Sequence, residues 1–64
     1  MRTEFVVTVK HPNGKTDRSS YMGRKWGEEA ASKAKMTYEP QGCEVHFSKV
    51  QYQGSSFLRS ENIW

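Results

Sequence analysis

The chain has 64 residues and carries ten Lys and Arg residues against seven Asp and Glu residues, which gives a formal net charge of +3. Residues 1–64 are expected to form one domain, because this length is close to the lower limit for folding without a metal ion or a disulfide. Only 34% of the residues are hydrophobic, so a few large side chains must fill the core. The basic balance argues against a DNA mimic, which needs a dense array of carboxylates.

The cysteine content and the hydropathy of the sequence indicate the cellular compartment in which the protein is expected. A single cysteine, Cys43, excludes an intramolecular disulfide and a zinc site built from several cysteines. We expect Cys43 to be a half-buried strand residue. The sequence contains no long apolar run and no signal-peptide pattern, so we expect a cytoplasmic protein without a membrane partner.

The first third of the chain is typical of a β-hairpin. Residues 4–10 are rich in β-branched and aromatic side chains, which predicts a strand. Asn13-Gly14 predicts a two-residue turn, because both residues tolerate a positive φ. The second strand is then expected over residues 15–22.

This turn predicts the register of the hairpin. Counting outward from it places Val6 opposite Tyr21 and Phe5 opposite Met22. Side chains alternate along a strand, so Tyr21 is expected on the open face of the sheet. The face that a helix covers is expected to carry Phe5, Val7, Val9 and Met22.

A helix is predicted over residues 28–38, with Gly27 as the candidate N-cap. It is ended by Pro40 and Gly42, which do not continue a helix. Apolar residues recur at every fourth position and are expected to face the sheet. These residues are Trp26, Ala30, Ala34 and Tyr38.

Two further strands are predicted, over residues 43–52 and 56–59. In the longer one the inward positions are first odd and then even: Cys43, Val45 and Phe47, followed by Val50 and Tyr52. This change predicts a bulge or bend near Ser48-Lys49. The expected fold class is α+β, in the order ββαββ, with an antiparallel sheet and a single helix packed on one face.

No catalytic, metal-binding or cofactor-binding pattern is present. His11 and His46 have no ligands at metal-binding spacing and are expected to be solvated surface residues. Cys43 and His46 are three positions apart on one strand, so they point to opposite faces and do not form a thiol–imidazole pair. We therefore expect a protein that is not an enzyme and that needs no cofactor.

Basic residues interleaved with aromatic residues are the best candidates for partner binding. Such surfaces suit a nucleic-acid backbone with stacked bases, or an acidic protein surface. The same charges also serve solubility and the protection of sheet edges. The candidate partner-binding residues are Lys15, Arg18, Tyr21, Lys49, Tyr52 and Arg59.

The segment that leaves the helix resembles a known inhibitor family. Tyr38-x-Pro40-x-Gly42-x-Glu44-Val45 is similar to the helix–strand junction of the short phage inhibitor of bacterial RNA polymerase. That family uses arginines on the following strand, whereas this chain has Phe47 and Lys49 at the matching positions.

The wider layout resembles small anti-CRISPR proteins, particularly a type I-F group. The shared pattern is a Glu29-Ala30-Ala31 helix, a long strand, a Gly-containing turn and a strand ending near a terminal Trp64. The resemblance covers about 40 of the residues. It implies stoichiometric inhibition, in which the protein occupies the groove where a Cas effector complex captures target DNA.

These observations give the expected function and its alternatives. We expect a small phage protein, acting as a monomer or weak dimer in the cytoplasm of the host bacterial cell, that blocks target-DNA binding by a Cas effector complex. An inhibitor of host RNA polymerase is the first alternative. The second is a small basic nucleic-acid-binding accessory protein, and weak nucleic-acid binding is also compatible with the first expectation.

Overall fold

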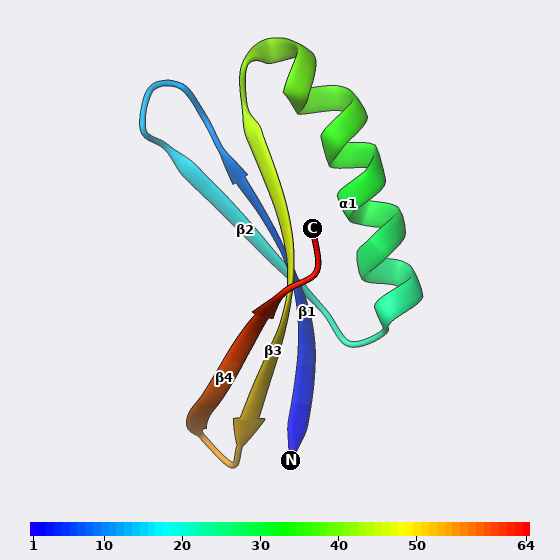
Figure 1. Ribbon diagram of the computed structural model, residues 1–64, viewed down its shortest axis with the longest axis vertical. Coiled ribbons are helices and arrows are strands. Elements are labelled where there is room, and N and C mark those ends of the chain that lie inside the picture. The colour runs from blue at the N-terminus through cyan, green and yellow to red at the C-terminus, as the bar shows by residue number, and fades with distance from the viewer.

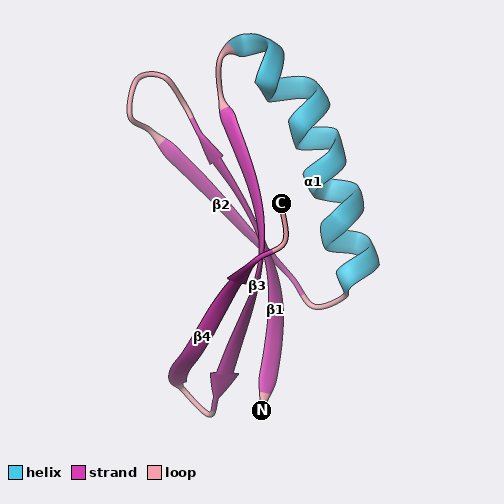
Figure 2. Cartoon of the chain, in the orientation of Figure 1, coloured by secondary structure: helices cyan, strands magenta, loops and turns pink.

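Strand β1 is central to the fold, because β2 and β3 pair with it on either side. The computed structural model describes all residues, 1–64. Every strand pair is antiparallel, and the sheet order is β2-β1-β3-β4 (Figure 1, Figure 2). This confirms the predicted α+β fold in ββαββ order. The elements are β1 (Arg2–Lys10), β2 (Thr16–Tyr21), α1 (Arg24–Tyr38), the 3-10 turn η1 (Glu39–Gln41), β3 (Glu44–Gln53) and β4 (Ser56–Asn62).

The β1–β2 hairpin turns through three residues, so the predicted two-residue turn is wrong. The His11 N–H donates to the Lys15 carbonyl at 2.8 Å, and the Gly14 N–H donates to the His11 carbonyl at 3.0 Å. Gly14 has a φ of 90°, whereas Asn13 has a negative φ. This geometry is a type I turn followed by a left-handed glycine, and Pro12 favours it because its fixed φ suits the first central position.

The longer loop shifts the hairpin register by one residue. Phe5 pairs with Tyr21 and Val6 pairs with Ser20, in place of the predicted Val6–Tyr21 and Phe5–Met22 pairs. Tyr21 therefore lies on the same face as Phe5 and packs against the core, so its predicted place on the open face is wrong. Met22 follows the strand and is exposed rather than covered by the helix.

Helix α1 begins one turn earlier than predicted, and its N-cap is Gly23 instead of Gly27. Gly23 has an extended backbone and no side chain to cap the first N–H groups. The buried positions of the helix are Gly27 and Ala31. Trp26, predicted to lie in the inward stripe, is 71% exposed. Ala30, Ala34 and Tyr38 do pack against the core as predicted.

The core is centred on Phe47, the one large side chain that is fully buried. Its ring lies 6.1 Å from the Phe5 ring and 5.6 Å from the Trp64 ring, measured between centroids. The backbone N–H groups of Ile63 and Trp64 both donate to the Phe47 carbonyl, at 2.8 and 3.2 Å. The C-terminus therefore returns to lie between the sheet and the helix (Figure 1).

Strand β3 pairs with β1 without interruption, so of the bulge or bend predicted near Ser48-Lys49 the bulge is absent. The register runs from Arg2–Tyr52 to Lys10–Glu44. The change from odd to even buried positions is instead a change of face. Val50 lies opposite Glu4, on the sheet face that points away from the helix, and it is only 2% exposed.

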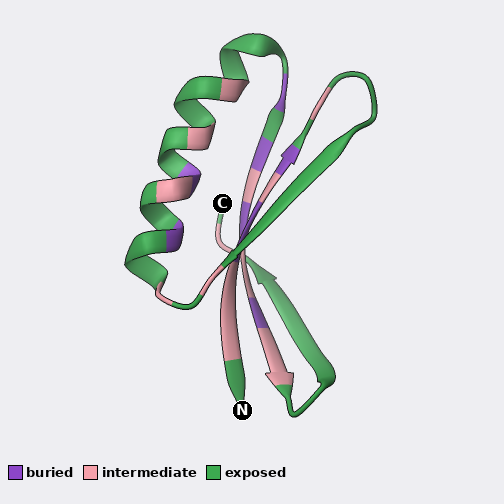
Figure 3. Cartoon of the chain, turned by 180° about the vertical axis from the view of Figure 1, so that it is seen from behind, coloured by how far each residue is buried: buried purple, intermediate pink, exposed green.

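The irregularity of the sheet lies between β3 and β4. Gln51 pairs with Arg59 and Tyr52 pairs with Phe57, which leaves Leu58 as the extra residue of a bulge. Strand β4 continues beyond the predicted end at residue 59 to Asn62. Both edge strands, β2 and β4, are exposed along almost their whole length (Figure 3).

Candidate functional site

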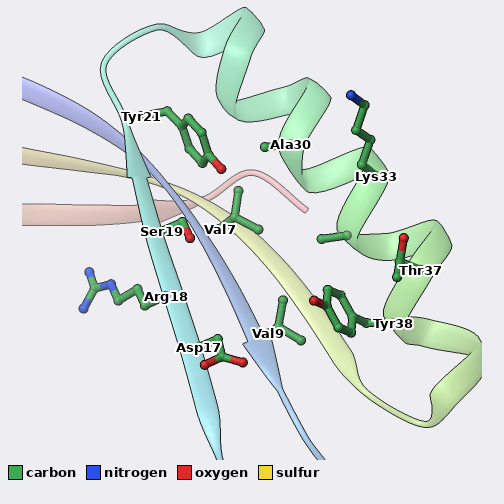
Figure 4. A pocket seen from close by; sticks show the side chains of 11 residues that line it. Val7, Val9, Asp17, Arg18, Ser19, Tyr21, Ala30, Lys33, Thr37 and Tyr38 are labelled. Carbon is green, nitrogen blue, oxygen red and sulfur yellow. The ribbon is translucent and has the colours of Figure 1, made fainter.

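A groove lies between helix α1 and edge strand β2 (Figure 4). Its volume is about 610 Å³. Its floor is apolar, and its rim carries charged and hydroxyl groups. The floor is formed by Val7, Val9, Tyr21, Ala30, Ala34 and Tyr38, and the rim by Asp17, Arg18, Ser19, Lys33 and Thr37. We call this the α1–β2 groove.

The groove exists because the helix lies over β1 and β3 and leaves most of β2 uncovered. The β2 residues on the helix side, Asp17, Ser19 and Tyr21, are the partners of Val9, Val7 and Phe5. Asp17 and Ser19 are polar and offer the helix no apolar surface to cover. The hydrophobic driving force therefore holds the helix over β1 and β3 only.

A second hollow extends the groove toward the start of the helix. It shares Tyr21, Ala30 and Lys33 with the first hollow, and adds Trp26 and Glu29. These two neighbouring hollows are together called the channel. The exposed indole of Trp26 lies at one end of it, and Tyr38 lies toward the other. An apolar channel with a polar rim is the usual form of a binding site for another molecule.

The unpaired charges of the α1–β2 groove are positive. Its carboxylate, Asp17, accepts a hydrogen bond from the His11 imidazole, with 2.7 Å between Oδ2 and Nε2. Arg18 and Lys33 make no ion pair. Lys15, at the adjacent hairpin loop, makes none either. Lys33 therefore offers a free cation on the helix side of the groove, and Arg18 offers one on the opposite face of β2.

A thiol, an imidazole and a carboxylate meet beside the groove, which the sequence analysis did not foresee. His11 Nδ1 lies 3.4 Å from Cys43 Sγ, while Nε2 contacts Asp17. The His11 ring also meets Tyr38 edge-on, at 5.8 Å between centroids. His11 is half-buried, so its predicted solvated position is wrong.

The order of groups in this cluster is that of a nucleophile, a base and an orienting carboxylate. Cys43 is buried, however, and it lines none of the hollows. The cluster therefore ties the hairpin loop to the junction between α1 and β3. His46, which the sequence analysis weighed as a partner of Cys43, lies on the opposite face as predicted, opposite Thr8.

The six predicted partner-binding residues do not form one surface. Lys15, Arg18 and Tyr21 lie on or beside β2. Arg18 and Tyr21 are among the residues that line the α1–β2 groove, whereas Lys15 lies outside it at the hairpin. The other three lie on β3 and β4. The side chain of Arg59 donates to Gln51 at 2.9 Å and pairs with Glu61 at 2.8 Å.

Tyr52 and Lys49 lie on opposite faces of β3. The guanidinium of Arg2 lies 4.7 Å from the centroid of the Tyr52 ring, and the Phe57 ring meets it edge-on at 6.2 Å. Lys49 lies between Phe5 on β1 and Glu61 on β4. Trp26 and Lys33, which the prediction omitted, belong to the groove instead.

Comparison with known proteins gives no relative. The sequence matches no protein-family model, and no curated protein or solved structure is significantly similar to it. The structure gathers no group of three or more His, Cys, Asp or Glu side chains that can hold a metal ion. Its one helix is too short and too polar to cross a membrane.

Proposed function

We propose that this chain acts by stoichiometric binding to another protein, and not by catalysis. The observation that carries this proposal is the placement of its large apolar side chains. Only Phe47 is fully buried, whereas Met1, Met22, Trp26, Met36, Phe57, Leu58 and Trp64 are exposed. Single exposed apolar residues are common on protein surfaces, but Trp26 borders a groove with an apolar floor, which is typical of an interaction site.

The target that we propose is a Cas effector complex of the host bacterium, with the chain acting as an anti-CRISPR protein of a phage. The sequence resemblance through Glu29-Ala30-Ala31 and Trp64 supports this choice, together with the net charge of +3. In this role the protein occupies the path of target DNA inside the bacterial cytoplasm, as a monomer or weak dimer.

Host RNA polymerase is a second proposed target. The junction from Tyr38 to Val45, which resembles the phage inhibitor of that enzyme, folds as a 3-10 turn with Gly42 at a φ of 87°. Lys49, on the strand that follows, is the single basic residue at the matching positions.

Affinity capture tests the proposal and separates the two targets. The tagged chain is expected to recover Cas subunits from a lysate that contains a type I-F system, or else RNA polymerase subunits. A variant with Lys49→Glu and Arg59→Glu is expected to fold normally and to recover less of the target. A wild-type chain that recovers neither complex would contradict the choice of targets.

Binding to free nucleic acid is the competing function. A nucleic-acid-binding protein shows affinity for duplex DNA or RNA that falls steeply as salt is raised. We expect at most weak binding at low salt, measured by a gel-shift titration. Tight binding to free duplex with a steep salt dependence would favour the accessory-protein function instead.

A further inference from the structure

The outer edge of β2 has the backbone pattern that accepts another strand. The His11 N–H donates to the Lys15 carbonyl, so these two residues form a hydrogen-bonded pair of the antiparallel ladder. From that pair onward, non-hydrogen-bonded and hydrogen-bonded pairs of β1 and β2 residues alternate. Asp17, Ser19 and Tyr21 therefore direct their backbone groups toward β1. The N–H and C=O groups of Thr16, Arg18 and Ser20 point outward, with no neighbouring strand. This edge contains no proline and no bulge.

The other edge of the sheet is protected. Strand β4 carries the Leu58 bulge, which interrupts a regular ladder. Its Arg59 and Glu61 side chains are paired with each other. Charged residues and bulges are the devices by which proteins keep edge strands from pairing. Only β2 is left as a regular, open edge.

We propose that β2 receives an extended segment of the partner protein as a fifth strand of the sheet, and that this segment alternates apolar and acidic side chains. The inference rests on the proposed function as a protein-binding inhibitor. It adds the binding site and the chemistry of the segment that is bound.

The apolar half of this pattern follows from the α1–β2 groove. A strand added beside β2 directs every second side chain to the helix side of the sheet. There these side chains meet the apolar floor at Tyr21 and Ala30, and Trp26 lies at the end of the channel. Pockets for alternate side chains, next to a paired backbone, are the usual means by which strand addition gains specificity.

The acidic half of the pattern follows from Arg18. Arg18 lies opposite Thr8, on the face away from the helix, and has no carboxylate partner. Lys15 also stands unpaired beside the same edge. An acidic segment therefore complements the free charges. On the helix side, Asp17 is already bound by His11 and Glu29 is unpaired, which favours apolar over acidic side chains there.

The two other candidate occupants fit less well. A nucleic-acid backbone offers only acceptors to the edge, and leaves the outward carbonyls of β2 unsatisfied. A second copy pairing through its own β2 would bring Asp17 and Ser19 to the apolar floor, since these residues share a face with Tyr21. It would also supply no carboxylate except Asp17, which is already engaged.

The test uses a synthetic hexapeptide that alternates valine and glutamate, capped at both ends, and the isotope-labelled full chain in solution. Amide shift changes are expected along β2 and the facing side of α1. The amides of Thr16, Arg18 and Ser20 are expected to become protected from exchange. Shift changes without this alternating protection, changes centred on β4, or no binding at millimolar peptide would overturn the proposal.

Variants of two residues make the test specific. Ser20→Pro removes an outward N–H without removing a ladder bond, and we expect it to weaken peptide binding by at least ~10-fold. Ser20→Ala keeps the N–H and is the matched control, expected to bind like the wild type. Equal binding by Ser20→Pro would contradict strand addition.

Arg18→Glu provides a second variant in case Ser20→Pro does not fold. We expect this variant to bind the valine–glutamate peptide about 5-fold more weakly than the wild type, and to prefer a valine–lysine peptide instead. An unchanged preference would overturn the acidic part of the proposal.

Affinity capture then separates this inference from the proposed function. Capture of the same host complex by wild type and Ser20→Pro, to equal extents, would refute strand addition and leave the inhibitor intact. Specific peptide binding at β2 by a chain that captures neither complex would support strand addition and contradict the proposed targets.

Discussion

Replacing Gly27 by alanine tests how closely α1 lies on the sheet. A Cβ at this position would lie 3.0 Å from Phe5 Cβ and 3.0 Å from Phe47 Cε1. Carbon atoms prefer about 3.5–4.0 Å. The Phe5 Cβ is attached directly to a central strand, and the Phe47 ring is fully buried, so neither can turn aside.

Two opposing effects set the expected magnitude. Alanine in a helix interior is favoured over glycine by about 1 kcal/mol. Overpacking in a filled core costs about 1–3 kcal/mol. We therefore expect Gly27→Ala to lower the free energy of unfolding by about 1 kcal/mol, although the substitution raises helix propensity.

Urea unfolding followed by circular dichroism measures this change. Ser32→Ala is the matched control, because Ser32 is an exposed position of the same helix without a side-chain hydrogen bond. It is expected to raise the free energy of unfolding by about 0.5 kcal/mol. In a chain that also carries Phe47→Leu, Gly27→Ala is expected to lower the free energy of unfolding by at least ~0.5 kcal/mol less than it does in the wild type. A more stable Gly27→Ala variant in the wild-type background would refute the close approach.

Three further predictions concern the ends of the elements. Gly23→Asp supplies the missing N-cap, so the free energy of unfolding of this variant is expected to be about 1 kcal/mol higher than that of the Gly23→Ala variant. Equal stabilities of the two variants would contradict the assigned helix start. His11→Ala removes contacts to Asp17 and Cys43 and is expected to lower the free energy of unfolding by about 1–2 kcal/mol, measured by urea unfolding. An unchanged free energy of unfolding would indicate that the His11 side chain lies in solvent. Cys43 is expected to react with a thiol reagent only as fast as the chain opens, so labelling must accelerate with urea, and immediate labelling of the native protein would show that the thiol is accessible.

The order of the elements was predictable because the local signals agree. The β-branched run before the hairpin, the alanine-rich helix and the Pro40–Gly42 stop each favour one structure. The inward helix face was predicted less well. The sequence pattern does not distinguish a stripe through Trp26 from one through Gly27, because the choice depends on how closely Phe5 and Phe47 let the helix approach.

The hairpin register shows what a local signal leaves out. Asn13-Gly14 alone favours a two-residue turn, but Pro12 immediately before it favours a type I turn with only Gly14 left-handed. The Asn13 side chain supports this turn by accepting a hydrogen bond from the Lys15 N–H at 2.9 Å. One residue of difference decides which face Tyr21 occupies.

Prediction of the candidate site depended on that register. Lys15, Arg18 and Tyr21 were chosen for charge and aromatic character. The structure places Arg18 and Tyr21 among the residues that line the α1–β2 groove, and Lys15 at the neighbouring hairpin. The His11–Asp17–Cys43 cluster was missed, because the two-residue turn puts Asp17 on the wrong face. Lys49, Tyr52 and Arg59 stay a prediction about a separate surface, for which the double substitution of Lys49 and Arg59 is the test.

The groove follows from the same residues that hold the core together. Gly27 and Phe47 fix the helix over β1 and β3, because only there can the backbone approach so closely. Strand β2 has no apolar residue to draw the helix further, apart from Tyr21 at its end. A larger residue in place of Ser19 would fill the channel from within and compete with any added strand. The polar composition of β2, which adds little to stability, is therefore what leaves this edge open to the strand that we propose to bind there.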